Sequence, residues 1–386
     1  MRLYEWAGKD LLRGAGIAVP KGRLAHTPEQ AAAACEELGG TAILKAQVRQ
    51  GRRGKAGLIR KVDSGEAAAA AADLLASSLE GEPVQALLVE EPVAAGAEWY
   101  AAVTMDDLSG RPVVLVSLKG GTEVEAEAEP PIRMEVNPLR GLSRHDAATL
   151  WRAAGLRGLP LRSAADALVG LYKVFVESDA VLVEVNPLFS RGDDPLIAGD
   201  AKVVIDESSL FRHPLWRDER LADPMLHPLE RKAASLGVVY IELDGDIAVL
   251  SGGAGATMAL LDAIQHHGGR PANFLDAAGG SGPETLRHMV DLVLEKVATD
   301  DRVKAVVLNV TVAGTPLESF VKGATAALSQ RPPRVPIFGC VRAAAAAIRT
   351  MSLAEGAAIL SGHGVRLFPD LRQAVLAAVA CSRGDQ

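Results

Sequence analysis

Residues 45–57 read KAQVRQGRRGKAG, in which an apolar strand pattern carries Lys45 into a loop dense in glycine and cations. Arg52, Arg53 and Gly54 lie at the centre of this loop. Glycine lets backbone amides approach an anion, and lysine and arginine neutralise phosphate oxygens. The stretch therefore predicts a strand followed by a phosphate-binding loop, although a structural basic turn has the same composition.

A second polar group follows the next strand pattern along the chain. Residues 87–93 read LLVEEPV, so that an apolar strand ends in acids, and Glu98 follows eight positions after Glu90. Carboxylates at a strand end can accept hydrogen bonds from an adenine amino group or from ribose hydroxyls. A solvated strand exit would look the same, and both interpretations stay open.

A third group has the oxygen side chains that a divalent cation needs. Residues 183–188 read VEVNPL and residues 199–202 read GDAK, which places Asn186 and Asp200 fourteen positions apart on strand patterns that a hairpin could join. Mg²⁺ binds such oxygen ligands, keeps several waters and bridges nucleotide phosphates. The alternative is a buried polar pair that the backbone satisfies.

The order of helix and strand patterns predicts two domains. The first half begins with a helical spacing over 3–13 and continues with strands interleaved with alanine-rich helices, as in an α+β domain with much antiparallel sheet. Its strand patterns cover 42–48, 85–90, 99–105, 112–118, 180–185 and 196–205. Residues 213–237 lose the strand rhythm and contain several prolines, which is typical of a linker.

The second half alternates strictly between strand and helix, which predicts a doubly wound parallel sheet of the α/β class. Its strand patterns cover 238–243, 247–251, 272–275, 304–310, 335–340 and 365–368. Its helical patterns cover 254–267, 283–298, 316–329, 343–357 and 370–381. We place the two domains at 1–225 and 238–386.

Composition excludes several classes of function. The net charge of −7 over 386 residues gives no general attraction to nucleic acid or to anionic lipid. No apolar run reaches the length of about 20 residues that spans a bilayer. The three cysteines are far apart and lack metal-site spacing, so a reducing, cytoplasmic location is expected.

Five motifs occur in the order seen in the β subunits of succinyl-CoA synthetase, and the chain resembles that family over almost its whole length. The motifs are LYEWAGKDLL at 3–12, the loop at 45–57, VEVNPL at 183–188, SLFRHP at 209–214 and HGGRPANFLD at 267–276. The resemblance implies an ATP-grasp domain followed by a flavodoxin-like domain, in an acyl-CoA ligase that forms ADP or GDP.

The resemblance also implies roles for particular residues. Lys45, Arg52, Arg53 and Gly54 match the family's phosphate contacts with ATP or GTP, and Asn186 and Asp200 match its Mg²⁺ ligands. The remaining matches are Glu90, Val93 and Glu98 as base and ribose contacts, and Glu184 as a candidate catalytic residue that helps to pass the phosphoryl group. A second EVNPL copy, at 135–139, falls where the family has a non-catalytic loop.

In this family a separate α subunit carries the phosphorylated histidine and binds CoA. None of the eight histidines of this chain matches that histidine, so an α-type partner is expected. The acid substrate would meet the phosphohistidine near Gly252, Gly314 and Thr315. There the sequence departs from the family, because Gly252 replaces an asparagine, a Phe-Gly-Gly-Ile turn is absent and residues 341–345, which read VRAAA, replace a polar loop.

These departures leave three hypotheses open. The first is an acyl-CoA ligase subunit whose small carboxylate is not plain succinate. The second is an ATP-grasp ligase that uses a nucleophile other than CoA, and the third is a catalytically silent regulatory subunit. The choice between ATP and GTP and the number of subunits are also open.

Overall fold

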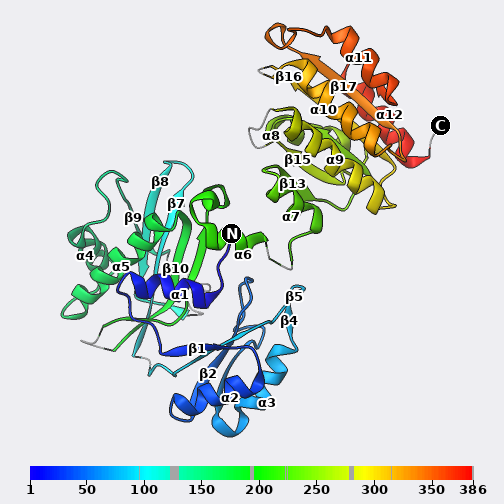
Figure 1. The fold of residues 1–386 in the computed structure, drawn as a ribbon. Helices are drawn as coiled ribbons and strands as arrows, with labels where there is room; N and C mark the ends of the chain where they lie inside the picture. The colour runs from blue at the N-terminus through cyan, green and yellow to red at the C-terminus, as the bar shows by residue number, and fades with distance from the viewer. Residues whose placement is uncertain are drawn as a thin grey trace. The chain divides into compact units, whose positions relative to one another are not determined.

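A computed structural model describes residues 1–94, 96–121, 130–191, 195–221, 223, 225–277, 282–313 and 315–384. The chain divides into two compact units, Met1–Arg220 and Leu221–Gln386, which are coloured blue to green and green to red in Figure 1. None of the described helices is both long enough and apolar enough to cross a lipid bilayer.

The first unit begins with a small antiparallel sheet covered by two helices. Its strand order is β1-β6-β2-β3, and α2 and α3 pack their alanine faces on one side of it, as Figure 1 shows. The strands are β1 (Gly22–Ala25), β2 (Thr41–Ala46), β3 (Ile59–Asp63) and β6 (Leu87–Glu90), and the helices are α2 (Pro28–Glu37) and α3 (Ser64–Leu75). A short hairpin, β4 (Ser78–Leu79) with β5 (Glu82–Pro83), lies between them in sequence.

Six described strands form the larger sheet of this unit, in the order β11-β10-β7-β8-β9 with β12 also pairing with β10. They are β7 (Ala97–Asp106), β8 (Arg111–Ser117), β9 (Ile132–Glu135), β10 (Ala180–Ser190), β11 (Ile197–Ala198) and β12 (Lys202–Ile205). The helices of this part are α1 (Glu5–Gly14), α4 (Arg144–Ala153), α5 (Pro160–Glu177) and α6 (Pro214–Leu221), with a 3₁₀ helix at Glu207–Arg212.

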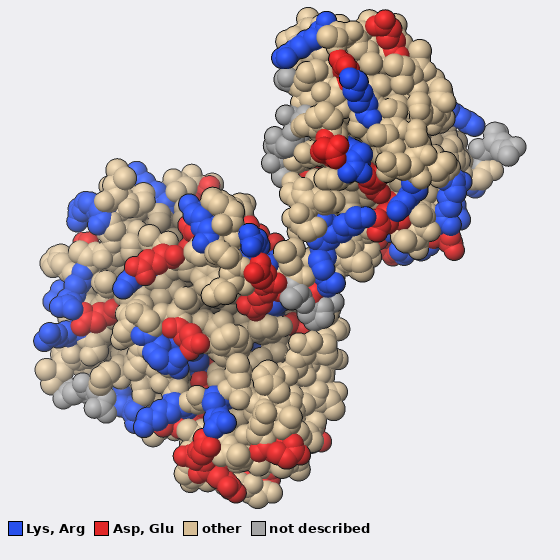
Figure 2. Space-filling model, viewed as in Figure 1, with Lys and Arg blue, Asp and Glu red and all other residues tan. Residues whose placement is uncertain are grey.

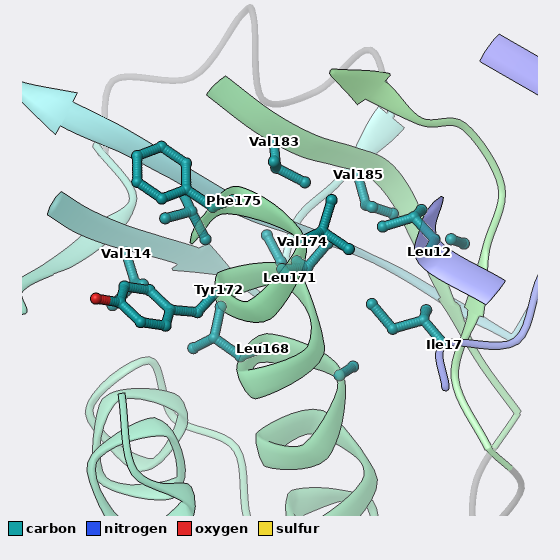
Figure 3. Packing of buried hydrophobic residues seen from close by; sticks show 14 of the residues in the cluster. Leu12, Ile17, Val114, Leu168, Leu171, Tyr172, Val174, Phe175, Val183 and Val185 are labelled. Atoms are coloured by element: carbon teal, nitrogen blue, oxygen red, sulfur yellow. The ribbon is translucent and has the colours of Figure 1, made fainter. Parts of the chain in front are cut away.

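One face of the larger sheet is apolar and the other carries polar groups. Val183 and Val185 of β10 point toward α5, where Leu171 and Phe175 meet them, and Leu12 of α1 borders the same core (Figure 3). Because side chains alternate along a strand, the residues between these valines lie on the opposite face. Glu184 therefore lies on that opposite face.

The second unit contains a four-stranded parallel sheet with the order β14-β16-β17-β18. Helices α8 and α12 pack on one face, and α9 and α10 pack on the other, which confirms the doubly wound α/β class. The strands are β14 (Ile247–Ser251), β16 (Ala305–Val312), β17 (Ile337–Ala343) and β18 (Val365–Leu367). The helices are α7 (Pro228–Ser235), α8 (Ala254–His266), α9 (Pro283–Thr299), α10 (Leu317–Gln330), α11 (Leu353–Gly362) and α12 (Leu371–Arg383).

Two expected strands of this unit lie outside the parallel sheet, and strict alternation was wrong there. Strand β13 (Val239–Glu242) pairs antiparallel with β15 (Asn273–Asp276). Only four residues separate β13 from β14, whereas a parallel neighbour needs a crossover of a dozen or more. A short turn at Gly245 therefore leads from β13 into β14, and any side chain there would collide with the Pro271 carbonyl.

Residues 213–237, expected as a linker, contain helices α6 and α7. Pro214 and Pro228 begin these helices instead of breaking them, because proline at the first helical position loses no hydrogen bond. His227 and Glu230 form a reciprocal cap at the start of α7. The prolines were therefore helix-start signals.

The helix expected over 343–357 was also wrong. Strand β17 continues to Ala343, a 3₁₀ helix covers Ala345–Ala347, and α11 begins only at Leu353. Ser352 and Glu355 cap that helix reciprocally. Specific capping therefore set the helix start where alanine propensity alone would have begun it ten residues earlier.

The outer edge of β14 is completed by a buried side chain next to an isolated backbone bridge between Ile247 and Pro271. Asn273 is buried, accepts from the Val249 N–H at 2.9 Å and donates to the Val249 carbonyl at 2.9 Å. Replacing Asn273 with leucine should lower the free energy of unfolding by about 1–3 kcal/mol for each backbone group left unpaired. Chemical denaturation measures this, with exposed Asn137→Leu as the control; equal losses would contradict the role.

Candidate functional site

Six charged side chains meet in the first unit, where α1, β2, β6 and the loop between β11 and β12 converge. All of them except Asp200 are buried or nearly so, and they alternate in sign through the cluster. The surface in Figure 2, by contrast, shows acids and bases exposed to solvent. The members of this charge cluster are Glu5, Lys9, Lys45, Arg53, Glu90 and Asp200.

Glu5 on α1 contacts all three cations of the charge cluster. Its Oε1 lies 2.8 Å from the Nζ of Lys45 and 2.8 Å from the Nζ of Lys9. Its Oε2 lies 2.7 Å from the Nη2 of Arg53. A carboxylate that is 1% exposed therefore orients both residues expected to bind phosphate, Lys45 and Arg53.

Glu90 at the end of β6 points into the same cluster. Its two carboxylate oxygens each accept from Lys9 at 2.6 Å, and Oε2 lies 3.0 Å from the Nζ of Lys45. Because Glu90 is 2% exposed, its side chain serves the cations of the cluster here. The expected contact of Glu90 with a base or ribose is not part of this arrangement.

The charge cluster joins the small sheet to the larger one. The carbonyl of Gly199 accepts from Lys45 at 2.6 Å and from Lys9 at 3.0 Å. The next residue, Asp200, accepts through Oδ1 from Arg53 at 3.0 Å and from the Ala201 N–H at 2.8 Å. Two lysines and one arginine thus fix the position of an expected metal ligand.

Opposite charges, not solvent, determine the protonation states in this cluster. Burial alone would raise the pKa of Glu5, but Lys45, Lys9 and Arg53 together hold that pKa well below its usual range. Burial alone would lower the pKa of Lys45, but Glu5, Glu90 and Asp200 raise it above its usual value. Both groups are therefore charged at neutral pH.

The glycine-rich loop presents one buried and one exposed arginine. Arg53 is buried and also donates to the Ala46 carbonyl at 3.1 Å. Arg52 is exposed and has a φ of 63°, in the left-handed region, and Gly54 beside it is exposed. Of the expected phosphate residues, the structure brings Lys45 and Arg53 together and leaves Arg52 and Gly54 at the surface of the loop.

The polar face of the larger sheet carries the expected Glu184. Its Oε2 lies 3.6 Å from the Nζ of Lys202, its neighbour across the β10–β12 pair. Burial and then the charge of Glu184 raise the pKa of Tyr100 on β7 to about 12. Glu184 therefore lies between a cation and a phenol that remains protonated at neutral pH.

This arrangement predicts a coupled alkaline titration. A raised phenol pKa stabilises the fold below the ordinary value of about 10, and that contribution is lost as the pH rises toward 12. Glu184→Gln should lower the pKa of Tyr100, because one negative charge is removed while burial remains. Absorbance titration of the phenols measures it, with Tyr100→Phe to identify the signal; an unchanged titration would contradict the placement of Glu184.

Asn186 lies on β10, the strand that also carries Glu184, and its side chain contacts the backbone of Gly121. Its Oδ1 accepts from the Gly121 N–H at 2.5 Å and its Nδ2 donates to the Gly121 carbonyl at 3.1 Å. The oxygen expected to bind Mg²⁺ therefore already has a donor. Asp200 uses only Oδ1 in its described bonds, which leaves Oδ2 for a cation.

These donors fit Mg²⁺ bound with a nucleotide better than Mg²⁺ bound alone. No group of three or more His, Cys, Asp or Glu side chains within the described ranges could hold a metal by itself. Mg²⁺ commonly takes one or two protein oxygens and completes its shell with waters and phosphates. Asp200 and Asn186 are oxygen donors of this kind, and both remain predicted ligands.

The remaining expected nucleotide contacts lie outside the charge cluster. Glu98 is exposed on β7, where it is paired with Phe189 of β10, and Val93 is half-buried in the segment after β6. A cavity of about 290 Å³ lies between α1 and β1. Lys9 and Glu90 contribute to its wall, whereas Lys45, Arg53 and Asp200 are not among its lining residues.

In the second unit, the expected substrate residues follow neighbouring parallel strands. Gly252 follows β14 and Thr315 follows β16, and the two strands are paired, so both residues lie at one edge of the sheet. Helix α8 begins just after Gly252 without a side-chain cap, and a side chain at Gly252 would meet open space. Gly314 lies outside the described residues.

Helix α10 begins one residue later than its sequence suggested. Pro316 takes the cap position, and the helix begins at Leu317. The carboxylate of Glu318, in the first turn, contacts Lys322 at 2.5 Å and the Thr350 hydroxyl. The Lys322 cation, one turn along α10, therefore draws the carboxylate away from the helix start.

Sequence reasoning missed Glu5 and Lys9, although LYEWAGKDLL was one of the matching motifs. The available signal was an acid and a base four positions apart on the buried face of a helix, since charged residues are rarely buried unless paired. Gln47 was missed as well. Its Oε1 accepts from the Trp6 N–H at 3.1 Å and its Nε2 donates to the Lys45 carbonyl at 3.0 Å, which ties α1 to β2.

The two EVNPL copies differ in the structure. Asn137 is exposed in a turn after β9, where its Oδ1 accepts from the Leu139 N–H at 2.9 Å. Asn186 lies within β10 and is followed by a cis peptide bond to Pro187. The first copy therefore has a local structural role, in which Asn137 stabilises a turn.

Comparisons with known proteins cover the whole chain. The ATP-grasp domain family matches residues 2–190 and the CoA-ligase family matches residues 250–381. The β subunit of the ADP-forming succinate–CoA ligase of Desulfurococcus amylolyticus is 38% identical over 392 residues and is covered completely, as is this chain. The GDP-forming β subunit of Thermus thermophilus is 35% identical, again over the full length of both chains.

A solved structure has the same fold. ATP citrate lyase from Methanothrix soehngenii, in complex with citrate and coenzyme A, matches 98% of this chain and 99% of its own with a TM-score of 0.76 and 16% identity. The sequence relatives carry the assignment of the family, and this structure supports the fold alone. The chain belongs to the succinate–CoA ligase β-subunit family of acid–thiol ligases, with an ATP-grasp domain followed by a CoA-ligase domain.

Proposed function

We propose that this chain is the nucleotide-binding subunit of an acyl-CoA ligase that forms ADP or GDP and works with an α-type partner. The observation that carries the proposal is the charge cluster, in which buried Glu5 and Glu90 hold Lys45 and Arg53 beside Asp200. Preset cations and a metal ligand are what phosphoryl transfer requires of a protein, because the reaction depends mainly on positioning and charge.

The nucleoside triphosphate lies with its phosphates against Lys45 and Arg53. Asp200 and Asn186 are the residues that would hold Mg²⁺. When bound, Mg²⁺ neutralises phosphate charge and orients the transferred group. Glu184, held beside Lys202 and Tyr100, lines the same face and orients the groups that exchange the phosphoryl unit. To hold the ion as well, Asn186 would share the Oδ1 that accepts from the Gly121 N–H.

The chemistry then passes to groups on the partner and at the second unit. A histidine of the α-type partner accepts the phosphoryl group, and the nucleoside diphosphate is released. A carboxylate takes the group from phosphohistidine as an acyl phosphate, and the CoA thiol displaces phosphate. The uncapped start of α8 after Gly252, together with Gly314 and Thr315, binds the anionic groups, since helix N-termini favour anions.

The acid is a small carboxylate other than plain succinate. The edge of the parallel sheet that would meet it has Gly252 at the end of β14 and exposed alanines, Ala344 and Ala345, after β17. These residues cannot donate side-chain hydrogen bonds to a second carboxylate. Pro316, at the cap position of α10, supplies no N–H.

The test is release of ADP or GDP by this chain co-purified with its α-type partner, over a panel of mono-, di- and tricarboxylates with and without CoA. We expect CoA-dependent release with one acid and little with succinate. Release without CoA, accompanied by another acyl product, would indicate a ligase with a different nucleophile. No release with any acid, despite nucleotide binding, would indicate a silent regulatory subunit.

A further inference from the structure

Helix α1 supplies the two deepest members of the charge cluster. Glu5 and Lys9 lie one helical turn apart, and their side chains are 1% and 2% exposed. Both side chains are almost fully enclosed, although Lys9 contributes to the wall of the cavity between α1 and β1. Their contacts nevertheless include Lys45, Arg53, Glu90 and the Gly199 carbonyl.

The charges of the cluster show what each of the two residues contributes. Glu5 binds Lys45 and Arg53 through different carboxylate oxygens, which fixes the separation of the two cations. Lys9 is bound by both oxygens of Glu90 and thereby shares that carboxylate with Lys45. The six charges of the cluster sum to zero, with three cations against three carboxylates, so that loss of Lys9 would leave one net negative charge beside the phosphates.

We propose that Glu5 and Lys9 are positioning residues that preset the phosphate-binding cations and the metal ligand of the nucleotide site. This inference rests on the proposed function. Glu5 sets Lys45 and Arg53, and Lys9 offsets one of the three carboxylates, so that the charge cluster carries no net negative charge. Lys9 and Lys45 also donate to the Gly199 carbonyl. The next residue, Asp200, is thereby held with its Oδ1 3.0 Å from the Nη2 of Arg53.

A merely structural role and a positioning role give different results in a double variant. Removing one partner of a buried ion pair leaves an unpaired charge and destabilises the fold, whereas replacing both partners with neutral groups of similar shape is often nearly neutral. Glu5→Gln combined with Lys9→Met keeps the net charge and the volume. Its thermal midpoint should therefore be closer to that of the wild type than the midpoint of either single variant.

The double variant should recover thermal stability but should not recover nucleotide binding. Isothermal titration with ADP and Mg²⁺ should show at least a 10-fold weaker affinity for the double variant, and the ratio of ADP affinity to adenosine affinity should fall. The matched control is Arg60→Met with Asp73→Asn, an exposed pair with a 3.2 Å contact between β3 and α3. This control should bind ADP like the wild type.

The outcomes separate the two proposals. A wild-type chain that binds no ADP in the presence of Mg²⁺ would contradict the proposed function itself. A wild-type chain that binds ADP, with a double variant of equal affinity, would contradict the positioning role alone. If the double variant does not fold, Glu5→Asp decides: its shorter side chain keeps the charge, and we expect a weaker ADP affinity at a preserved thermal midpoint.

Discussion

Replacing Asp200 with alanine is expected to abolish nucleotide-dependent acyl-CoA formation by the chain and its α-type partner, with a loss of at least about 100-fold. Asp200 accepts from Arg53 at 3.0 Å and has a second oxygen for Mg²⁺. The variant loses the predicted metal ligand and one of the two carboxylate partners of Arg53. Turnover with the preferred acid, and its dependence on Mg²⁺ concentration, measure the effect.

The control for this prediction is Asp73→Ala, which removes an exposed carboxylate of the same unit that pairs only with Arg60 among the described residues. It should leave turnover unchanged. The fold of Asp200→Ala should also survive, because Asp200 is the most exposed member of the charge cluster. Wild-type turnover by Asp200→Ala would disprove the metal assignment.

Replacing Lys45 with methionine is expected to weaken both the fold and nucleotide binding. Lys45 contacts Glu5 at 2.8 Å and Glu90 at 3.0 Å, and both carboxylates are buried. Loss of one partner from a buried ion pair typically costs about 3–5 kcal/mol of unfolding free energy. Affinity for ADP with Mg²⁺ should fall at the same time, because a phosphate-binding cation is lost.

Denaturation and calorimetry on the same sample measure the two effects of Lys45→Met. Lys61→Met removes an exposed cation from the neighbouring strand β3 and should change neither quantity. Lys45→Arg should recover part of the stability, because the positive charge between Glu5 and Glu90 returns. Tight ADP binding by Lys45→Met would show that this residue does not contact phosphate.

Much of the fold followed from periodicity and glycine placement. The strand carrying Lys45, the following loop and the parallel strands of the second unit lie where the sequence predicted them. The errors at α7 and α11 share one cause, since local contacts set helix starts that composition did not reveal. Ser352 and Glu355 begin α11, and Pro228 begins α7.

The parallel sheet shows a different limit of sequence reasoning. The pattern of β13 is that of a strand, and nothing in its own residues distinguishes it from a strand of the parallel sheet. The four-residue connection to β14 excludes β13 as a parallel neighbour of β14, because it is too short for a crossover. Connection lengths therefore decided the topology where hydrophobic patterns could not.

The site was predictable where a residue type suits one chemistry and was missed where a residue acts through another. Asp200 and Lys45 were singled out because metal and phosphate select carboxylates and cations, and the structure places both in the charge cluster. Glu5 and Lys9 were not singled out, because they contact other charged side chains and only the three-dimensional contacts show this. Glu90 stays a predicted nucleotide contact, although its carboxylate contacts Lys9 and Lys45 in the structure.

The most direct test of the account is transfer of phosphate from γ-labelled ATP or GTP by this chain, in the presence of Mg²⁺, to its co-purified α-type partner. We predict label on the partner that is stable to base and labile to acid, as expected for phosphohistidine. The label should be lost when the correct carboxylate and CoA are added. A partner that stays unlabelled while the chain binds nucleotide would contradict the account.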